Sequence, residues 1–466
     1  MAALAKRAAF VTQLVLRNVK SFLGDQTLDL TDENGAPARW TLILGDNGVG
    51  KTTLLECLAH LAPVFGYNTE SPYNPEDPLK YIEPRVESAE NLVIESLGRN
   101  GDIDFKIEAT FTVDSELESP LPAPDTVVTS LTFSRVGEKS DNIVAASNWS
   151  KDKQIVESTW PQHSKFRQPL VLAYGAGRHM GLENLDFSDP PEPTDSLLKG
   201  TVPLVDADQL LQRLDYSAKS SPEAARQRDM LIEMIAALLP EVEQAANIHV
   251  YPPPALGSKG KRGVYVRTSD GEVPLRQLSF GYQTMTAWLA DIGWWLFRHY
   301  PESDRPLDEP AIVLVDEIDL HLHPRWQRQI RERLTLHFPN IQFIATAHSP
   351  LMAQAFLDAN LAVVTRDGDH SIIENDPVVV ANWRVDQIIT SDLYDLPAWP
   401  PQVDALFEEQ RRLLGSPERS PADATRLKEI EAELLELPTE RSSEDERAMT
   451  IIKEAAALLK SSARRA

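Results

Sequence analysis

The chain has 466 residues, of which 42% are hydrophobic and 25% are charged, the balance of a globular protein with room for about two or three domains. Lys and Arg total 46 against 70 Asp and Glu, which gives a formal net charge of −24. Such an acidic protein repels a nucleic-acid backbone over most of its surface, so any DNA contact requires a local basic patch or a partner subunit.

Cellular location follows from what the sequence lacks. The single cysteine, Cys57, cannot form an internal disulfide, which suits a reducing cytosol. No stretch approaches the ~18 apolar residues needed to cross a bilayer. The apolar run that ends at Phe10 breaks at Thr12 and Gln13, too early for the core of a signal peptide. We therefore expect a cytoplasmic protein without a membrane partner.

The first elements surround a phosphate-binding loop. Residues 14–19 and 40–44 have the pattern of strands, and residues 52–59 have the apolar spacing of a helix. Between the second strand and the helix lie Gly45, Asp46, Asn47, Gly48, Val49, Gly50, Lys51 and Thr52, followed by Thr53. Glycines let main-chain N–H groups point at phosphate oxygens, the lysine reaches the β and γ phosphates, and the Thr52 hydroxyl holds Mg²⁺. An ordinary tight turn is the alternative, but the strand and helix on either side favour a nucleotide site.

The middle of the chain predicts β structure followed by helices. Residues 84–175 are expected to be mostly β, with strands at 91–95, 103–107 and 170–174 and an exposed proline-rich loop at 120–125. The acidic, proline-rich segment 186–195 is typical of a linker or mobile loop. Later elements are expected in this order: helical residues 205–246, a hairpin of 248–251 with 263–267, a tryptophan-rich helix, a strand at 311–315, a helix from about residue 324 and a strand at 341–345.

The last ~80 residues predict charged helices at 403–414 and 426–437, which form either a solvated appendage or a surface that docks another chain. We therefore divide the chain into four parts. We expect residues 1–185 and 247–385 to be the two halves of an α/β nucleotide-binding head, residues 186–246 to be a linker and helical insertion, and residues 386–466 to be a helical appendage for partner binding or regulation.

A second nucleotide motif lies far downstream. Residues 311–315 form a continuous apolar run, typical of a strand buried on both faces of a parallel sheet, and the run ends at Asp316 and Glu317. A carboxylate at this position can anchor the metal, and the next one can orient the attacking water. A plain exit from a strand is the alternative. No guanine-reading Asn/Thr-Lys-x-Asp string is present, which favours ATP over GTP.

Two further segments place the chain near a known family. Ser279, Phe280, Gly281 and Gln283 precede or open the tryptophan-rich helix, and Ala345-Thr346-Ala347-His348-Ser349-Pro350 follows the last of these strands. Together with the two nucleotide motifs, and in this order, they resemble the ATP-binding-cassette ATPases of the SMC/RecF-like branch. The opening strand, residues 14–22, resembles that branch as well.

The resemblance implies roles for individual residues and a symmetric dimer. Glu317 matches the catalytic base, Asp316 the magnesium-linked aspartate and His348 the switch histidine that senses the γ-phosphate. Ser279 and Gly281 match the signature loop, which contacts the nucleotide of the opposite subunit. ATP would then join two copies, and hydrolysis would release them. A plain helix N-cap at Ser279 and a hydrogen-bonded core histidine at His348 are the alternatives.

Several positions depart from the family pattern. Phe280 stands where transporters usually carry glycine, and His323 stands where related heads often have aspartate, a few residues after Asp319. The histidines at 321 and 323 could suggest a metal, but no third ligand is evident. No clear glutamine loop exists, and the segment that ends at Arg178 takes its place, with an arginine able to meet phosphate or the neighbouring subunit.

More narrowly, the segment 319–324, the segment 345–350 and residues 387–394 resemble prokaryotic defence ATPases such as the ATPase subunit of the Septu anti-phage system, which works with a separate HNH nuclease. The leading hypothesis is therefore an ATPase that gates a partner nuclease. The alternatives are a RecF-like repair ATPase that clamps DNA through Lys259, Lys261 and Arg262 or through the arginines at 325–333, and a scaffold that binds ATP with little turnover. A transporter motor is least favoured.

Overall fold

The computed structural model describes residues 8–62, 105–113, 126–135, 143–147, 169–181, 191–239, 242, 244–252, 260–269, 271–356, 359–375, 400–415 and 420–435. The chain divides into two units, residues 1–394 and 395–466, each of which is described by itself. The expected class, an α/β head with a mixed β lobe, inserted helices and a helical C-terminal part, is confirmed. The finer boundaries at 185, 246 and 385 stay a prediction.

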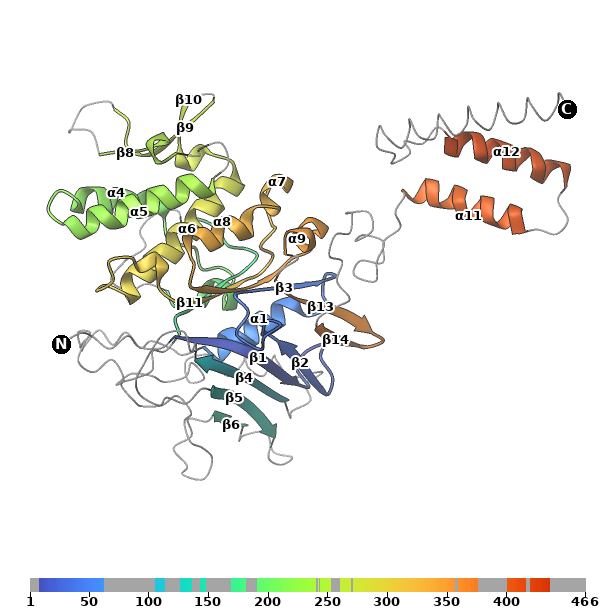
Figure 1. The fold of residues 1–466 in the computed structure, drawn as a ribbon, viewed down its shortest axis with the longest axis horizontal. Coiled ribbons are helices and arrows are strands. Elements are labelled where there is room, and N and C mark those ends of the chain that lie inside the picture. Colours follow the sequence, from blue (N-terminus) through green and yellow to red (C-terminus); the bar gives the residue numbers. More distant parts are fainter. Residues whose placement is uncertain are drawn as a thin grey trace. The chain divides into compact units, whose positions relative to one another are not determined.

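A six-stranded sheet forms the centre of the first unit (Figure 1). Five adjacent strands are parallel to one another, and a sixth strand at one edge is antiparallel to its neighbour. In spatial order the strands are β7 (Val171–Tyr174), β11 (Ala311–Val315), β12 (Ile341–Thr346), β3 (Trp40–Gly45), β13 (Asn360–Asp367) and β14 (His370–Asn375). Because β3, β11 and β12 are adjacent and parallel, the loops after them meet at one edge of the sheet.

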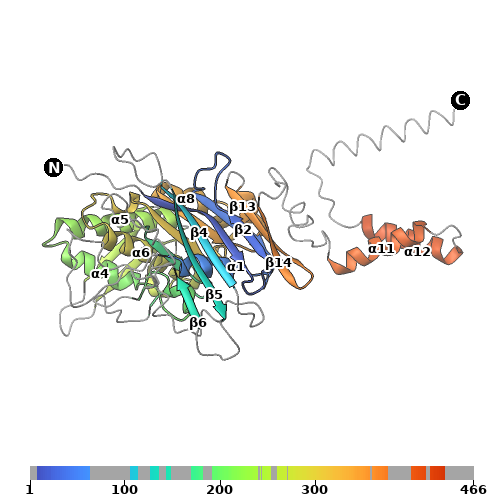
Figure 2. The ribbon, with the colours of Figure 1, turned by 90° about the horizontal axis from the view of Figure 1, so that it is seen from below.

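A second, antiparallel sheet lies on one side of the central sheet, together with helix α1 (Lys51–His60). Figure 2 shows its strands alongside one another. In spatial order they are β2 (Asp25–Asp29), β1 (Ala9–Arg17), β4 (Phe105–Val113), β5 (Thr126–Arg135) and β6 (Ile143–Ser147).

Helices cover the opposite side of the central sheet (Figure 1). They are α4 (Ala207–Ser217), α5 (Pro222–Leu238), α6 (Phe280–His299), α7 (Pro324–Gln327), α8 (Ile330–His337) and α9 (Pro350–Ala355). The short α3 (Asp195–Leu198) lies instead on the α1 side of the sheet, beside β7 and α1. A three-stranded antiparallel sheet of β8 (Ile248–Tyr251), β9 (Gly263–Thr268) and β10 (Gly271–Pro274) packs on α4.

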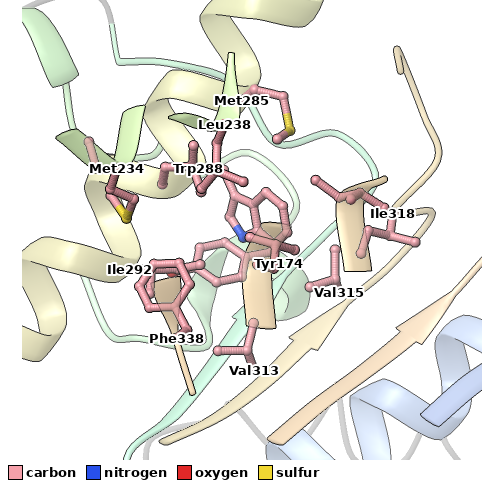
Figure 3. Close-up of a cluster of buried hydrophobic side chains, with 14 of the residues drawn as sticks. Tyr174, Met234, Leu238, Met285, Trp288, Ile292, Val313, Val315, Ile318 and Phe338 are labelled. Carbon is pink, nitrogen blue, oxygen red and sulfur yellow. The ribbon is translucent and has the colours of Figure 1, made fainter. Parts of the chain in front are cut away.

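The hydrophobic core follows the two faces of the central sheet. Along β11, Val313 and Val315 point into the helical side, while Ile312 and Leu314 point toward α1 and the antiparallel sheet. This alternation explains why the strand is apolar throughout, since neither face meets water. On the helical side, Tyr174 packs edge-on against Trp288 of α6, with ring centroids 6.0 Å apart (Figure 3).

One buried amide joins the two sheets. Gln342 of β12 is fully buried; its Oε1 accepts a hydrogen bond from the Val11 amide at 2.9 Å, and its Nε2 donates to the carbonyls of Val11 at 2.8 Å and Ala38 at 3.1 Å. The register of β1 against β4 shifts between Val11 and Gln13. A buried side chain of the central sheet therefore satisfies main-chain groups of β1 and of the segment before β3.

The second unit contains two helices, α11 (Pro401–Gly415) and α12 (Pro421–Leu435), among its described residues. Leu413, Leu427 and Ile430 form their shared apolar contact. Arg426 of α12 donates to Glu409 of α11 at 3.0 Å. Both helices were predicted from the sequence pattern, although α11 begins two residues and α12 five residues earlier than expected.

Most expected elements are present with shifted bounds. The strand expected at 14–19 corresponds to the second half of β1, which begins at Ala9 and ends at Arg17, because Asn18 adopts a left-handed conformation with φ 53°. The helix expected from residue 324 is two helices, α7 and α8. The sequence pattern missed β2, β10, β13 and β14. The strand at 91–95, the loop at 120–125 and residues 186–190 of the linker lie outside the described residues.

The end of the expected linker is anchored. The carbonyl of Pro193 accepts a hydrogen bond from the amide of Ala173 in β7, at 2.9 Å, and Thr194 and Asp195 are buried. Residues 193–195 therefore pack beside the central sheet. Among the described residues, no helix is long and apolar enough to cross a membrane.

Candidate functional site

The phosphate-binding segment from Gly45, at the end of β3, to Thr53, in the first turn of α1, depends on its glycines. Gly45, Gly48 and Gly50 have φ angles of 143°, 76° and 108°, which disfavour residues with a Cβ. A Cβ on Gly45 would lie 2.2 Å from the carbonyl oxygen of Val364, and one on Gly50 would lie 2.6 Å from Ser21 Oγ. Gly48 faces open space instead. Packing therefore fixes the two ends of the loop, while its middle stays open.

Lys51 is buried in this loop. Its Nζ donates hydrogen bonds to the carbonyls of Gly45 at 2.7 Å and Asp46 at 2.8 Å, and lies 3.4 Å from His348 Nδ1. Burial lowers the pKa of the ammonium, and the nearby carboxylates of Asp316 and Glu317 oppose that effect. The loop thus holds a cation beside its open centre.

The acid pair meets the phosphate loop directly. Asp316 follows β11 and is buried; its Oδ2 accepts a hydrogen bond from Thr52 Oγ1 at 2.9 Å, and its Oδ1 accepts one from Thr346 Oγ1 at 2.6 Å. Thr346 ends β12, and its Oγ1 also accepts the amide of Glu317 at 2.7 Å. Three adjacent parallel strands therefore bring Thr52, Asp316 and Thr346 together. Thr346 had no predicted role, although a hydroxyl at the end of a buried strand was a usable signal.

Glu317 and His348 face each other across the site. Glu317 Oε1 lies 3.9 Å from His348 Nε2, and about a third of each side chain is exposed. An ammonium only donates hydrogen bonds, so the contact with Lys51 assigns the acceptor role to Nδ1 of His348. The ring proton then lies on Nε2, the nitrogen that faces Glu317.

Asp319 holds the loop that carries His348. Its Oδ2 accepts hydrogen bonds from the amides of His348 at 3.1 Å and Ser349 at 2.8 Å. Its Oδ1 is buried and has no hydrogen-bond partner among the described residues. Asp319 therefore holds the main chain of the segment that carries His348, and its role in catalysis stays a prediction.

His323 and its neighbour His321 have other contacts. His323 caps α7, because its Nδ1 accepts the amide of Arg325 at 3.3 Å. His321 packs edge-on against Phe280, with ring centroids 4.9 Å apart. No cluster of three His, Cys, Asp or Glu side chains suited to a metal occurs among the described residues.

The signature segment lies at the start of α6. Ser279 and Phe280 are exposed there. Gly281 packs on the carbonyl of His321, where a Cβ would approach to 2.7 Å. The side-chain Nε2 of Gln283 donates to the carbonyls of Arg276 at 3.0 Å and Leu278 at 2.7 Å, so this side chain stabilises the loop before α6. The contact of this segment with a second copy stays a prediction.

Arg178 lies apart from the open face of the loop. It is 4% exposed, and its guanidinium donates hydrogen bonds to the carbonyls of Gly175, Asp316 and Glu317. The sequence placed it near phosphate or a neighbouring subunit, whereas in this chain it binds the main chain of the acid pair.

The residues present fit a magnesium nucleotide. Mg²⁺ prefers oxygen ligands, and the Thr52 hydroxyl and Asp316 carboxylate supply two side by side. The open space at Gly48, the cation of Lys51 and the N-terminus of α1 suit phosphate oxygens. Asp319 Oδ1, which has no partner among the described residues, could accept a hydrogen bond from a further polar group.

One residue of the predicted basic patch at the β8–β9 hairpin is paired with an acidic side chain. Lys261 forms an ion pair with Glu272, which Arg267 also contacts at 3.4 Å. Lys261 and Tyr251, both hydrogen-bonded to Glu272, hold the pKa of that carboxyl at about 2, so it stays charged. Lys259 lies outside the described residues. Arg262 is exposed, so of the two described residues of this patch, Lys261 is paired with a carboxylate and Arg262 faces solvent.

Comparison with known proteins decides the family. Residues 41–353, more than half of the chain, match the family described as "AAA domain, putative AbiEii toxin, Type IV TA system". The chain belongs to this AAA-domain family. The matched span begins in β3 and ends in α9, so it contains both nucleotide motifs, the signature segment and His348.

Relatives of this AAA-domain protein include a Septu protein PtuA from Bacillus mycoides (strain KBAB4). It is 25% identical over 428 residues, which cover 91% of this chain and 50% of the relative. The Retron Vc95 probable ATPase from Vibrio cholerae is 25% identical over 369 residues, covering 70% of this chain and 68% of the relative. The predicted resemblance to the Septu ATPase subunit is confirmed, and the chain spans about half the length of that Bacillus mycoides relative.

A solved structure, the SMC head domain from Thermotoga maritima, is also similar. It is 13% identical and aligns with a TM-score of 0.37, covering 79% of this chain and 99% of that domain.

Proposed function

We propose that the chain is an ATPase that uses Mg²⁺, works as a pair of heads and regulates a partner nuclease of the HNH type in anti-phage defence. One observation carries the ATPase part of the proposal. Thr52 of the phosphate loop and Asp316 of the acid pair are 264 residues apart in sequence and share a hydrogen bond of 2.9 Å. Family membership and the Septu and retron relatives support the same reading.

Each side chain has a chemical task in this proposal. Lys51 binds phosphate oxygens, and Thr52 with Asp316 holds the metal. Glu317 orients and deprotonates the water that attacks the γ-phosphate, ADP leaves, and His348 donates from Nε2 toward the γ-phosphate oxygens. Bound Mg²⁺ supplies the charge that stabilises the phosphate oxygens.

Exposure of the signature segment supports the pair of heads. Ser279 is exposed, and Phe280 beside it is a large apolar residue that is 53% exposed. A second copy seated there would cover Phe280 and place Ser279 against the neighbour's nucleotide. The two helices of the second unit are our candidate for the surface that binds the nuclease.

Phosphate release tests the ATPase. We expect measurable release from the wild type and none above background from Lys51→Ala or Glu317→Gln, with nucleotide binding lost in Lys51→Ala and kept in Glu317→Gln. Glu317→Gln is expected to accumulate as an ATP-bound dimer in size-exclusion chromatography. Equal release from all three proteins would refute the catalytic assignment. Binding without release in the wild type would favour the alternative, an ATP-binding scaffold.

Co-purification tests the partner. The tagged chain is expected to recover the product of a neighbouring gene, and the complex is expected to cut DNA only with that subunit present. A bare homo-oligomer that cuts DNA unaided would refute this part. Salt-sensitive DNA binding that is lost on charge reversal of Lys259, Lys261 and Arg262 would favour the RecF-like alternative instead.

A further inference from the structure

Arg178 forms an unusual buried contact. Its guanidinium donates from Nη1 to the carbonyl of Gly175 at 3.1 Å and to that of Asp316 at 2.6 Å, and from Nη2 to that of Glu317 at 3.0 Å. All three acceptors are main-chain oxygens. A cation is therefore buried to bind the backbone, although an apolar side chain of similar size would cost less to desolvate.

The surroundings indicate what keeps Arg178 charged. Burial lowers the pKa of its guanidinium to about 10, while the carboxylates of Asp316, Asp319 and Glu317 oppose that effect. The carboxylates of the acid pair and Asp319 thus attract the guanidinium, and the main-chain carbonyls of Asp316 and Glu317 accept its hydrogen bonds. Buried charges with specific partners concentrate at functional sites, which favours a role in the chemistry.

The two carbonyls of the acid pair explain that role. They belong to the peptide groups on either side of the Glu317 Cα, so one guanidinium binds both planes that define the φ and ψ angles of Glu317. In an extended strand, successive carbonyls point to opposite sides, so the two terminal nitrogens of one guanidinium could not reach both. Glu317 instead has φ 47°, a left-handed conformation that costs a non-glycine residue about 1–2 kcal/mol.

Helix α6 supports Arg178 from behind. The guanidinium carbon lies 5.7 Å from the ring centroid of Trp288, and one turn later Asp291 accepts a hydrogen bond from the hydroxyl of Tyr174 at 2.9 Å. Tyr174 and Arg178 therefore both contact α6, the helix that begins at the signature segment. Figure 3 shows Tyr174 beside Trp288 in this contact.

We propose that Arg178 is a positioning residue that holds the main chain of Glu317 in its left-handed conformation and so aims the carboxylate at the attacking water. Arg178 itself binds neither phosphate nor the partner copy. The inference rests on the proposed function, in which Glu317 is the catalytic base.

Two variants and a matched control test it. Arg178→Met keeps the length of the side chain and removes the guanidinium, and Arg178→Lys keeps the charge without the fork. Arg333→Met is the control, since Arg333 likewise donates to a main-chain carbonyl, that of Ala237 at 2.6 Å, and lies 5.7 Å from a tryptophan ring, but outside the site.

Kinetics and nucleotide binding give the first measurement. We expect Arg178→Met to lower kcat on the order of 100-fold, because small displacements of a catalytic group cost that much. The dissociation constant of a non-hydrolysable ATP analogue is expected to change less than about threefold, and Arg178→Lys is expected to lose less kcat than Arg178→Met. The Arg333→Met control is expected to leave both quantities unchanged.

Combination with Glu317→Gln separates positioning from direct contact. Glu317→Gln is expected to bind nucleotide without turnover, so if Arg178 acts only through Glu317, adding Arg178→Met to Glu317→Gln leaves the affinity for ATP unchanged. A fall in ATP affinity in the double variant would overturn the proposal, because it would indicate direct contact between Arg178 and phosphate.

Hydrogen exchange tests the main chain independently of turnover. Amide exchange in peptides that contain residues 316–320 is expected to accelerate in Arg178→Lys, and in Arg178→Met if it folds, but not in Arg333→Met. Unchanged exchange in Arg178→Lys would overturn the inference. If the wild type releases no phosphate, the proposed ATPase fails, and this exchange measurement still decides whether Arg178 holds Glu317.

Discussion

Asp291 allows a quantitative test of the packing between α6 and the central sheet. Its carboxylate is buried; Oδ1 accepts the amide of Val205 at 3.0 Å, and Oδ2 accepts the hydroxyl of Tyr174 at 2.9 Å. Burial raises the pKa of Asp291 to about 6, although both hydrogen bonds favour the charged form. The charged carboxylate is therefore less stable in the folded protein than in the unfolded chain.

The sign and size of the effect follow from linkage. Because the pKa of about 6 exceeds the ordinary 3.8, the folded state keeps its proton longer. The stabilisation that protonated Asp291 contributes to the free energy of unfolding is fully present below pH 4. It is lost as the pH rises from 4 to 6, and the loss amounts to about 3 kcal/mol. Above pH 6 the loss is nearly complete.

The variant Asp291→Asn removes this loss. Its amide oxygen still accepts the Val205 amide, and its NH₂ group faces the Tyr174 hydroxyl, which can accept a hydrogen bond. We expect the variant to be more stable than the wild type, with a gain at pH 7.5 that exceeds the gain at pH 5.5 by about 1 kcal/mol. Both values lie above the isoelectric point of about 4.9, where the protein stays charged.

Urea unfolding followed by tryptophan fluorescence measures the gain, since Trp288 packs against Tyr174. Asp304→Asn is the control, because that side chain is 90% exposed, and its pH dependence is expected to match the wild type. A gain that is the same at both pH values, or a uniform loss, would refute the raised pKa of Asp291.

Two further predictions concern the buried glutamine and the phosphate loop. Gln342→Leu removes the hydrogen-bond partner of the Val11 amide and of the Val11 and Ala38 carbonyls. We therefore expect the free energy of unfolding to fall by about 3 kcal/mol, and an unchanged urea midpoint would contradict this. Gly45→Ala places a Cβ 2.2 Å from the Val364 carbonyl, so we expect it to abolish binding of a fluorescent ATP analogue, with a milder loss in Gly48→Ala, where the space is open. Equal affinities in the two glycine variants would contradict the assigned packing.

The sequence predicted the nucleotide motifs well because each is local. A phosphate loop is defined by a strand, a glycine-rich turn and a helix that are contiguous in the chain, and the sequence placed all three within a residue of β3 and α1. The continuous apolar run of β11 likewise predicted a strand buried on both faces, because only a central parallel strand has no polar face. Fold class and family resemblance followed from the order of these local motifs.

The links between motifs were decided by the tertiary structure. Thr346 connects both members of the acid pair, Arg178 binds the main chain of Glu317, and Asp291 reaches Tyr174, and each contact spans residues far apart in the chain. Periodicity reports which face of an element is apolar, but it does not report which strands are neighbours. The spatial order β7, β11, β12, β3 brings these side chains together, and that order results from long-range packing, which no local pattern in the sequence encodes.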